Sequence, residues 1–164
     1  MIREPKPVEL EMLTDIAVEH AKDAGLKEHD VLERGWAKKQ LKAMMISPDY
    51  KILVDEQQGK FAGYAVGAVY QKLWNPTKHG ELVLFFVHPE VRNKYIADSL
   101  FDTMRQWFVD TGCVYYQASC LMYDNDYKPN EPWLRRATTY FKSRDMEQVG
   151  YHYVQNLEMF RWAE

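Results

Sequence analysis

One segment of the chain places a carboxylate, an apolar stretch and a basic loop in succession. Glu81 comes first and is followed by an apolar run over residues 82–87. His88-Pro89 interrupts this run, and the chain then reads Arg92-Asn93-Lys94-Tyr95-Ile96-Ala97. The apolar run is too short for a buried helix, so it predicts an internal strand. The helix expected after it begins near Arg92, and its free N–H groups together with Lys94 could bind a phosphate group.

Hydrophobic periodicity predicts the elements that would hold this segment in place. Apolar residues three and four apart indicate amphipathic helices, and short apolar runs bounded by Gly, Pro or Asn indicate strands. The expected order is helix 10–25, helix 32–46, strand 50–55, strand 60–70, strand 82–87, helix 92–111, strand 113–119, helix 132–141 and strand 148–162, with room for a short strand at the N-terminus. This order predicts an α/β fold whose sheet has mixed strand pairing.

Length and charge limit the classes of function. With 164 residues, the chain can bury one core, and we expect residues 1–164 to form a single domain. A formal net charge of −3 supplies no positive field for a polyanion, so we expect no nucleic-acid partner. The sequence has no apolar run of about eighteen residues and no secretory signal at its start, so we expect no membrane contact and a cytoplasmic location.

Cysteine and histidine spacing indicates neither a disulfide nor a metal site. Cys113 and Cys120 follow each other along one expected strand segment. At about 3.3 Å per residue they would lie beyond the ~7 Å Cα separation that a disulfide allows. The five histidines show no recognisable ligand spacing. We therefore expect free cysteines and no bound metal.

Residues 81–100 resemble the acyl-CoA motif of the GNAT N-acetyltransferase superfamily. In that superfamily an apolar strand ending in Val-x-Pro runs into a loop of the form Gln/Arg-x-x-Gly-x-Gly/Ala. Here Val87-His88-Pro89 leads to a loop with Arg92 and Ala97 in the matching positions, and Tyr95 stands where the first glycine is usual. The resemblance extends over nearly the whole chain. It implies a GNAT-like α/β fold, in which a mixed, mostly antiparallel central sheet is flanked by helices and splayed between the strands at 81–87 and 113–119.

The resemblance also implies acetyl-CoA as co-substrate. The loop and the helix N-terminus would hold the pyrophosphate through backbone N–H groups, and the pantetheine arm would lie in the splay between the strands. The cofactor-binding residues implied in this way are Phe86, Val87, Arg92, Asn93, Lys94, Tyr95, Ile96 and Ala97.

Two further residues take implied roles in catalysis. Some members of the superfamily carry, at the position of Glu81, a carboxylate that removes a proton from the attacking amine. An alkyl ammonium has a pKa of about 10.4 and no lone pair, so it needs such a base before it can attack a thioester. The superfamily often has a tyrosine as general acid where this chain has Phe141, so the adjacent Tyr140 is the candidate acid.

These features leave two functions open. The first is an N-acyltransferase that moves an acetyl group from acetyl-CoA directly to an amine of a small molecule or a protein. The acidic segments 28–30 and 124–126 would suit a cationic amine on the acceptor side. The second is a catalytically inactive GNAT-fold protein that acts by protein binding, as an inhibitor, regulator or assembly component. Tyr95, Phe141 and the abundance of Tyr, Trp and Met favour this alternative, and a homodimer or another protein partner is compatible with the sequence.

Overall fold

The computed structural model describes residues 1–24, 33–118 and 131–146. The chain divides into two compact units, Met1–Pro129 and Asn130–Glu164. Helix α4 (Glu131–Lys142) is the described element of the second unit, and it corresponds to the helix expected at 132–141. The sheet and all other described elements belong to the first unit.

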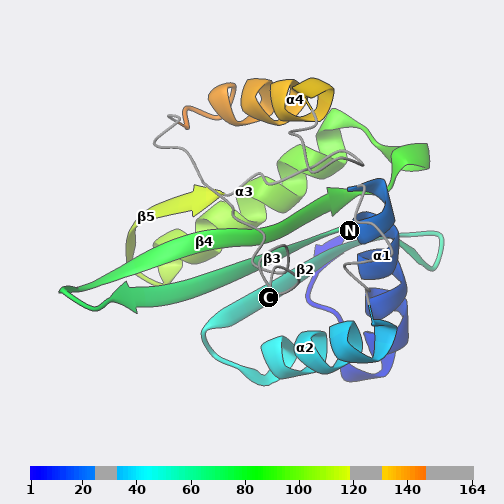
Figure 1. Cartoon of the computed structure of the whole chain (residues 1–164), viewed down its shortest axis with the longest axis horizontal. Coiled ribbons are helices and arrows are strands. Elements are labelled where there is room, and N and C mark those ends of the chain that lie inside the picture. Colours follow the sequence, from blue (N-terminus) through cyan, green and yellow to red (C-terminus); the bar gives the residue numbers. More distant parts are fainter. Residues whose placement is uncertain (25–32, 119–130, 147–164) are drawn as a thin grey trace, which may run out of the picture. The chain divides into compact units, whose positions relative to one another are not determined.

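Five strands of the described residues form the sheet of the first unit, and neighbouring strands are paired in the order β1-β2-β3-β4-β5 (Figure 1). The strands are β1 (Ile2–Arg3), β2 (Tyr50–Gln57), β3 (Lys60–Lys72), β4 (Asn75–Val87) and β5 (Cys113–Ala118). Adjacent strands are antiparallel except β4 and β5, which are parallel. A parallel pair needs a crossover connection, which α3 (Lys94–Asp110) supplies here. The mixed, mostly antiparallel sheet flanked by helices is therefore confirmed.

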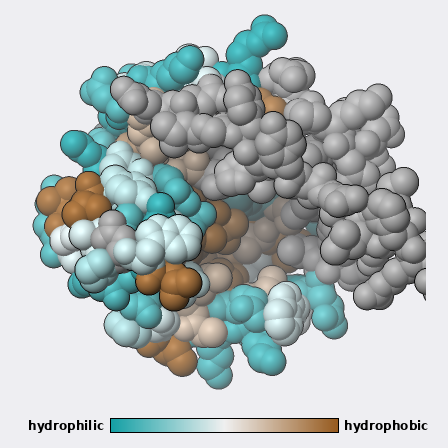
Figure 2. All heavy atoms as spheres, turned by 60° about the vertical axis from the view of Figure 1, so that its left-hand side comes forward, coloured by the Kyte–Doolittle hydropathy of each residue, from teal (hydrophilic) through white to brown (hydrophobic). Residues whose placement is uncertain are grey.

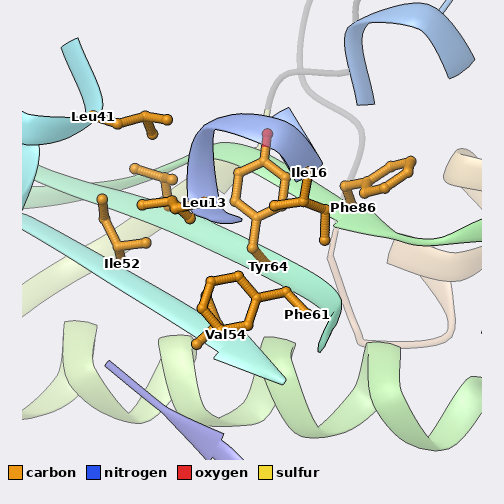
Figure 3. Packing of buried hydrophobic residues seen from close by; sticks show 9 residues of the cluster. Leu13, Ile16, Leu41, Ile52, Val54, Phe61, Tyr64 and Phe86 are labelled. Carbon is orange, nitrogen blue, oxygen red and sulfur yellow. The ribbon is translucent and has the colours of Figure 1, made fainter. Parts of the chain in front are cut away.

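Helices cover both faces of this sheet. Helices α1 (Leu10–Asp23) and α2 (Arg34–Ile46) lie on one face and α3 lies on the other (Figure 1). Leu13 and Ile16 of α1 pack against Tyr64 and Phe86 of the sheet, together with Leu41 of α2 (Figure 3). This buried cluster fixes α1 over the end of β4, next to the loop that leads into α3.

Two boundaries differ from the sequence-based expectation. Strand β4 begins at Asn75 rather than at residue 82, because its polar first half pairs with β3 from Lys72 onward. Helix α3 begins at Lys94 rather than near Arg92, since Asn93 caps it and a 3-10 turn, Pro89–Val91, comes before it. Pairing with β3 sets the start of β4, and capping by Asn93 sets the start of α3. Local hydrophobicity predicts neither boundary.

A bulge in β4 sets the direction of its side chains. Val66 of β3 pairs with Leu84 and Gly67 pairs with Leu82, so Val83 has no opposite residue and the register shifts there. Gly80 lies on the α3 face of the sheet, because a Cβ at this position would meet the Phe108 ring of α3. Leu84 lies on the opposite face, where it packs against the cluster under α1 and α2. Because the bulge shifts the alternation by one residue, Glu81 shares the α1 face with Leu84 rather than the α3 face.

Candidate active site

The last part of β4 pairs with β3 up to Val87 and leads into the loop before α3. The final parallel pair in the described part of the chain is Leu82 with Ala118, and β4 continues to Val87. Ala118 is the last residue of β5 that the structure describes, so any β5 partner of residues 83–87 would lie outside the described range.

The N-terminus of α3 adjoins this part of β4. The Asn93 side chain caps the helix by accepting a hydrogen bond from the Ile96 N–H at 2.9 Å, and it donates to the Val91 carbonyl at 3.0 Å. Lys94 and Tyr95 are the first two helical residues, so their N–H groups have no acceptor within the helix. Tyr95 is 79% exposed. The Lys94 ammonium is also solvent-exposed, 3.9 Å from Asp98.

Arg92 holds the loop between β4 and α3. Its Nε donates to the Val87 carbonyl at 3.1 Å, and its Nη2 forms an ion pair of 2.8 Å with Asp23 at the end of α1. The guanidinium also lies over the Phe86 ring, 5.9 Å from its centroid. Arg92 thus joins α1, β4 and the loop, while Lys94 is the cation of this segment that extends into solvent.

The remaining cofactor-binding candidates are mostly core residues. Phe86, Val87 and Ile96 are buried side chains, so they can contact a ligand in this loop only through their backbone or by shaping its floor. Ala97 is half-buried and its amide donates to the Asn93 carbonyl at 3.4 Å. The candidates predicted between Phe86 and Ala97 therefore come together, with the positively polarised end of α3 at their centre.

His20 also belongs to this region, although its sequence context did not indicate a site residue. Its Nδ1 lies 2.8 Å from the Tyr64 hydroxyl, and its ring stacks on Phe86 with centroids 4.8 Å apart. Burial lowers the pKa of His20 to about 4, with a smaller contribution from Arg92 opposed by Asp23. The imidazole is therefore neutral at pH 7. Leu13, Ile16 and His20 are three and four residues apart, and this helical spacing could have placed His20 on the buried face of α1.

Glu81 lies on the α1 face of the sheet, away from the loop. It pairs with Ala68 of β3 and with Gln117 of β5, and its side chain is half-buried. Its charge helps to raise the pKa of Tyr70, for which burial is the larger cause. The Glu81 carboxylate therefore lies near the Tyr70 hydroxyl on the α1 face of the sheet.

Tyr140, the other catalytic candidate, lies in the second unit. Its ring contacts Phe141 at 5.6 Å between centroids, and the Arg144 guanidinium lies 6.0 Å from its centroid. The acidic segments 28–30 and 124–126, expected on the acceptor side, fall outside the described residues.

Burial raises the pKa of the Cys113 thiol and outweighs the opposing effect of Lys78. Cys120 lies outside the described residues. Within residues 1–24, 33–118 and 131–146, no group of three or more His, Cys, Asp and Glu side chains could hold a metal ion. No helix in the same ranges is long and apolar enough to cross a membrane.

Solved structures share this fold. A predicted acetyltransferase from Clostridium acetobutylicum, solved with acetyl-CoA, gives a TM-score of 0.75 at 12% identity and covers 97% of each chain. An aminoglycoside N-acetyltransferase in complex with CoA gives 0.73 at 12% identity, over 95% of this chain and 93% of that chain. A glucosamine-6-phosphate N-acetyltransferase from Arabidopsis thaliana gives 0.70 at 14% identity, over 96% of this chain and 97% of that chain. These likenesses show the GNAT fold.

Sequence comparison then identifies the family. The model of the acetyltransferase (GNAT) family matches residues 11–128, which include β4, the Arg92 loop and α3. The chain therefore belongs to the GNAT acetyltransferase family. A comparison with curated protein sequences finds no match.

Proposed function

We propose that this protein is an acyl-CoA-dependent N-acyltransferase, which transfers an acetyl group from acetyl-CoA to an amine by direct attack. The observation that supports this most is the arrangement at the end of β4. At the loop after β4, the capped N-terminus of α3 leaves the Lys94 and Tyr95 N–H groups without an acceptor within the helix, and the exposed Lys94 ammonium belongs to the same turn. A helix end of this kind suits the negatively charged pyrophosphate of acyl-CoA.

The chain would hold the co-substrate with backbone more than with side chains. Lys94 and Tyr95 would donate their N–H groups to the pyrophosphate, and the Lys94 ammonium would add a charge-assisted contact. Asn93 would keep the helix end ordered through its bond to Ile96. Acetyl-CoA supplies the activated acyl group as a thioester.

Glu81 is the proposed general base. Its carboxylate removes a proton from the acceptor ammonium, either directly or through water, and the nitrogen lone pair then attacks the thioester carbonyl. The carbon–sulfur bond breaks, CoA leaves as the thiolate, and a proton donor converts the thiolate to the thiol. Tyr140 is the proposed donor. No covalent intermediate with the enzyme is needed, so Cys113 and Cys120 have no catalytic role in this proposal.

Calorimetric titration with acetyl-CoA, followed by thiol-release assays on a panel of amines, tests this function. We expect saturable binding, and at 100 times the dissociation constant a stabilisation of about 2.7 kcal/mol. Lys94→Glu should weaken binding, whereas the control Lys60→Glu, at the exposed first residue of β3, should leave it unchanged. Absence of binding and of thermal stabilisation in the parent protein would contradict the proposal.

One observation favours the alternative of a GNAT-fold protein that binds a partner and has lost catalysis. Arg92, in the position of the pyrophosphate-loop arginine, is already neutralised by Asp23. This alternative predicts a stable complex with another protein and no melting shift with acetyl-CoA. A clear shift together with acyl transfer to any amine of the panel would exclude it.

A further inference from the structure

The chain places one of its own ammonium groups on a tyrosine of the proposed acceptor face. Lys72 Nζ, at the end of β3, lies 5.2 Å from the ring centroid of Tyr115 on β5. A hydrogen bond with Tyr115 is the main reason that the pKa of Lys72 is raised. The Tyr115 ring therefore stabilises a charged alkyl ammonium, which is the chemistry of a cation–π contact supported by a polar group.

Tyr115 is one of three rings that form a row across the sheet. The Tyr115 ring meets His79 of β4 edge-on, with centroids 4.2 Å apart, and His79 stacks on Tyr70 of β3 at 6.0 Å. The charge of Glu81 in turn affects the Tyr70 hydroxyl. The ammonium position and the proposed base are thus connected through side chains on one face of β3, β4 and β5.

His79 gives a second observation on this row. The residue is 2% exposed, and its Nε2 lies 3.0 Å from the Thr77 hydroxyl. Its Nδ1 is buried and has no hydrogen-bond partner among the described residues. Buried polar atoms are nearly always paired, so this nitrogen marks a polar position between the half-buried Tyr70 ring and the exposed Tyr115 ring.

We propose that Tyr70 and Tyr115 form the acceptor subsite of this protein, and that its acceptor is an alkyl ammonium, such as a lysine side chain or a small alkylamine. This inference rests on the proposed acyltransferase function and names its substrate class. Lys72 occupies the subsite when the acceptor is absent and leaves it when the acceptor binds. The ring faces attract the cation, and Glu81 on the same face takes its proton.

A quaternary ammonium ion tests binding of the cation separately from acyl transfer. Pentyltrimethylammonium carries the charge but has no proton to lose, so its binding can be followed by NMR titration without any acyl transfer. Pentanol is the neutral control. We expect the quaternary ion to bind and to compete with pentylamine, and we expect pentanol to bind at least about threefold more weakly, the scale of a cation–π contact.

Three variants test the residues. Tyr115→Leu should weaken binding of the quaternary ion by about 2- to 10-fold, while Tyr115→Phe, which keeps the ring, should retain it. Lys72→Met should strengthen binding by a similar factor, because it removes the internal competitor. The matched control is Tyr116→Leu, since Tyr116 is the next residue of β5 and packs on Phe108 on the opposite face. Its affinity for the quaternary ion should equal that of the parent.

The outcomes distinguish this inference from the function on which it rests. Equal binding of pentanol and the quaternary ion, or unchanged affinity in Tyr115→Leu, overturns the subsite even if acyl transfer occurs. Ring-dependent binding of the ion without thiol release from acetyl-CoA supports the subsite and counts against the acyltransferase. A lower KM for a lysine-containing peptide than for pentylamine assigns the acceptor to protein lysines, and the reverse assigns it to small amines.

Discussion

The face of the sheet that carries α1 and α2 has two halves with different chemistry. Under the helices, Tyr64 and Phe86 are closed over by Leu13 and Ile16, and His20 completes this half by pairing with Tyr64 (Figure 3). Toward the β3–β4 hairpin the face carries the row of Tyr70, His79 and Tyr115, with Glu81 beside it.

The halves differ in how their polar atoms are satisfied. In the covered half, a neutral imidazole and a phenol satisfy each other, whereas in the hairpin half the His79 Nδ1 has no partner among the described residues. Exposed hydrophobic side chains occur at the hairpin end, where Leu73 and Trp74 form the turn, and hydrophobic and hydrophilic residues alternate over that side of the molecule (Figure 2). The covered half therefore stabilises the fold, and the hairpin half carries the proposed acceptor subsite.

The largest effect should come from the hairpin half. Glu81→Gln should lower turnover by about 10²- to 10⁴-fold at neutral pH, since the amine loses its base. The affinity for acetyl-CoA should change little. The loss should shrink at high pH, where more of the amine is already deprotonated. Steady-state kinetics between pH 7 and pH 9 measure both, and equal activity of the variant at pH 7 would remove Glu81 from the mechanism.

Acid should act first on the covered half. The folded-state pKa of His20, about 4, lies below its ordinary value of 6.5, so the unfolded chain binds the proton more readily. Stability is therefore full above about pH 6.5 and falls as the pH approaches 4, by roughly 2 kcal/mol between pH 7.5 and pH 5. Urea unfolding at these two pH values measures the change. His20→Gln should flatten this dependence, and an unchanged slope in that variant would assign it to another group.

A smaller effect is expected at Asn93, the cap of α3, where one substitution tests stability and another tests acetyl-CoA binding. Asn93→Ala removes the acceptor for the Ile96 N–H and should cost about 1 kcal/mol of unfolding free energy. Asn93→Asp keeps the cap and should retain stability, but its charge should weaken acetyl-CoA binding by roughly 3- to 10-fold through repulsion of the pyrophosphate. Thermal unfolding and calorimetry separate the two effects. Tight acetyl-CoA binding by Asn93→Asp would place the pyrophosphate elsewhere.

The smallest effect is expected at Tyr95. Because its ring is exposed and only its N–H is proposed to contact the ligand, Tyr95→Ala should change acetyl-CoA affinity by less than about twofold and stability by less than ~0.5 kcal/mol. Lys94→Ala is the comparison and should weaken binding more. A loss of tenfold or more in Tyr95→Ala would show that the ring itself binds the ligand.

Local sequence signals predicted much of the fold. Helix α1 ends at Asp23, close to the expected end near Gly25, and β5 begins at Cys113, as expected. The early start of β4 escaped prediction because Pro76, Thr77 and Lys78 have the composition of a loop and become a strand only by pairing with β3. The expected strand at 148–162 lies outside the described residues.

The sequence predicted which segment of the chain forms the candidate site, but it did not predict the contacts of this segment with distant residues. The Arg92 loop and the α3 start were found because their chemistry is contiguous in sequence. The ion pair between Arg92 and Asp23 and the contact between His20 and Tyr64 join residues far apart in the chain. Neither leaves a local pattern, since each depends on where α1 docks on the sheet.

The extra residue Val83 in β4 determines which face of the sheet the preceding side chains of the strand occupy. One inserted residue changes the parity of the strand, so the spacing between Glu81 and the Arg92 loop decides which side of the sheet the carboxylate occupies. A related sequence lacking the equivalent of Val83 could match every other letter of the motif and still present its carboxylate to α3. Deleting this single residue would thus change the orientation of a group without altering its identity, and an alignment gap at this point carries functional information.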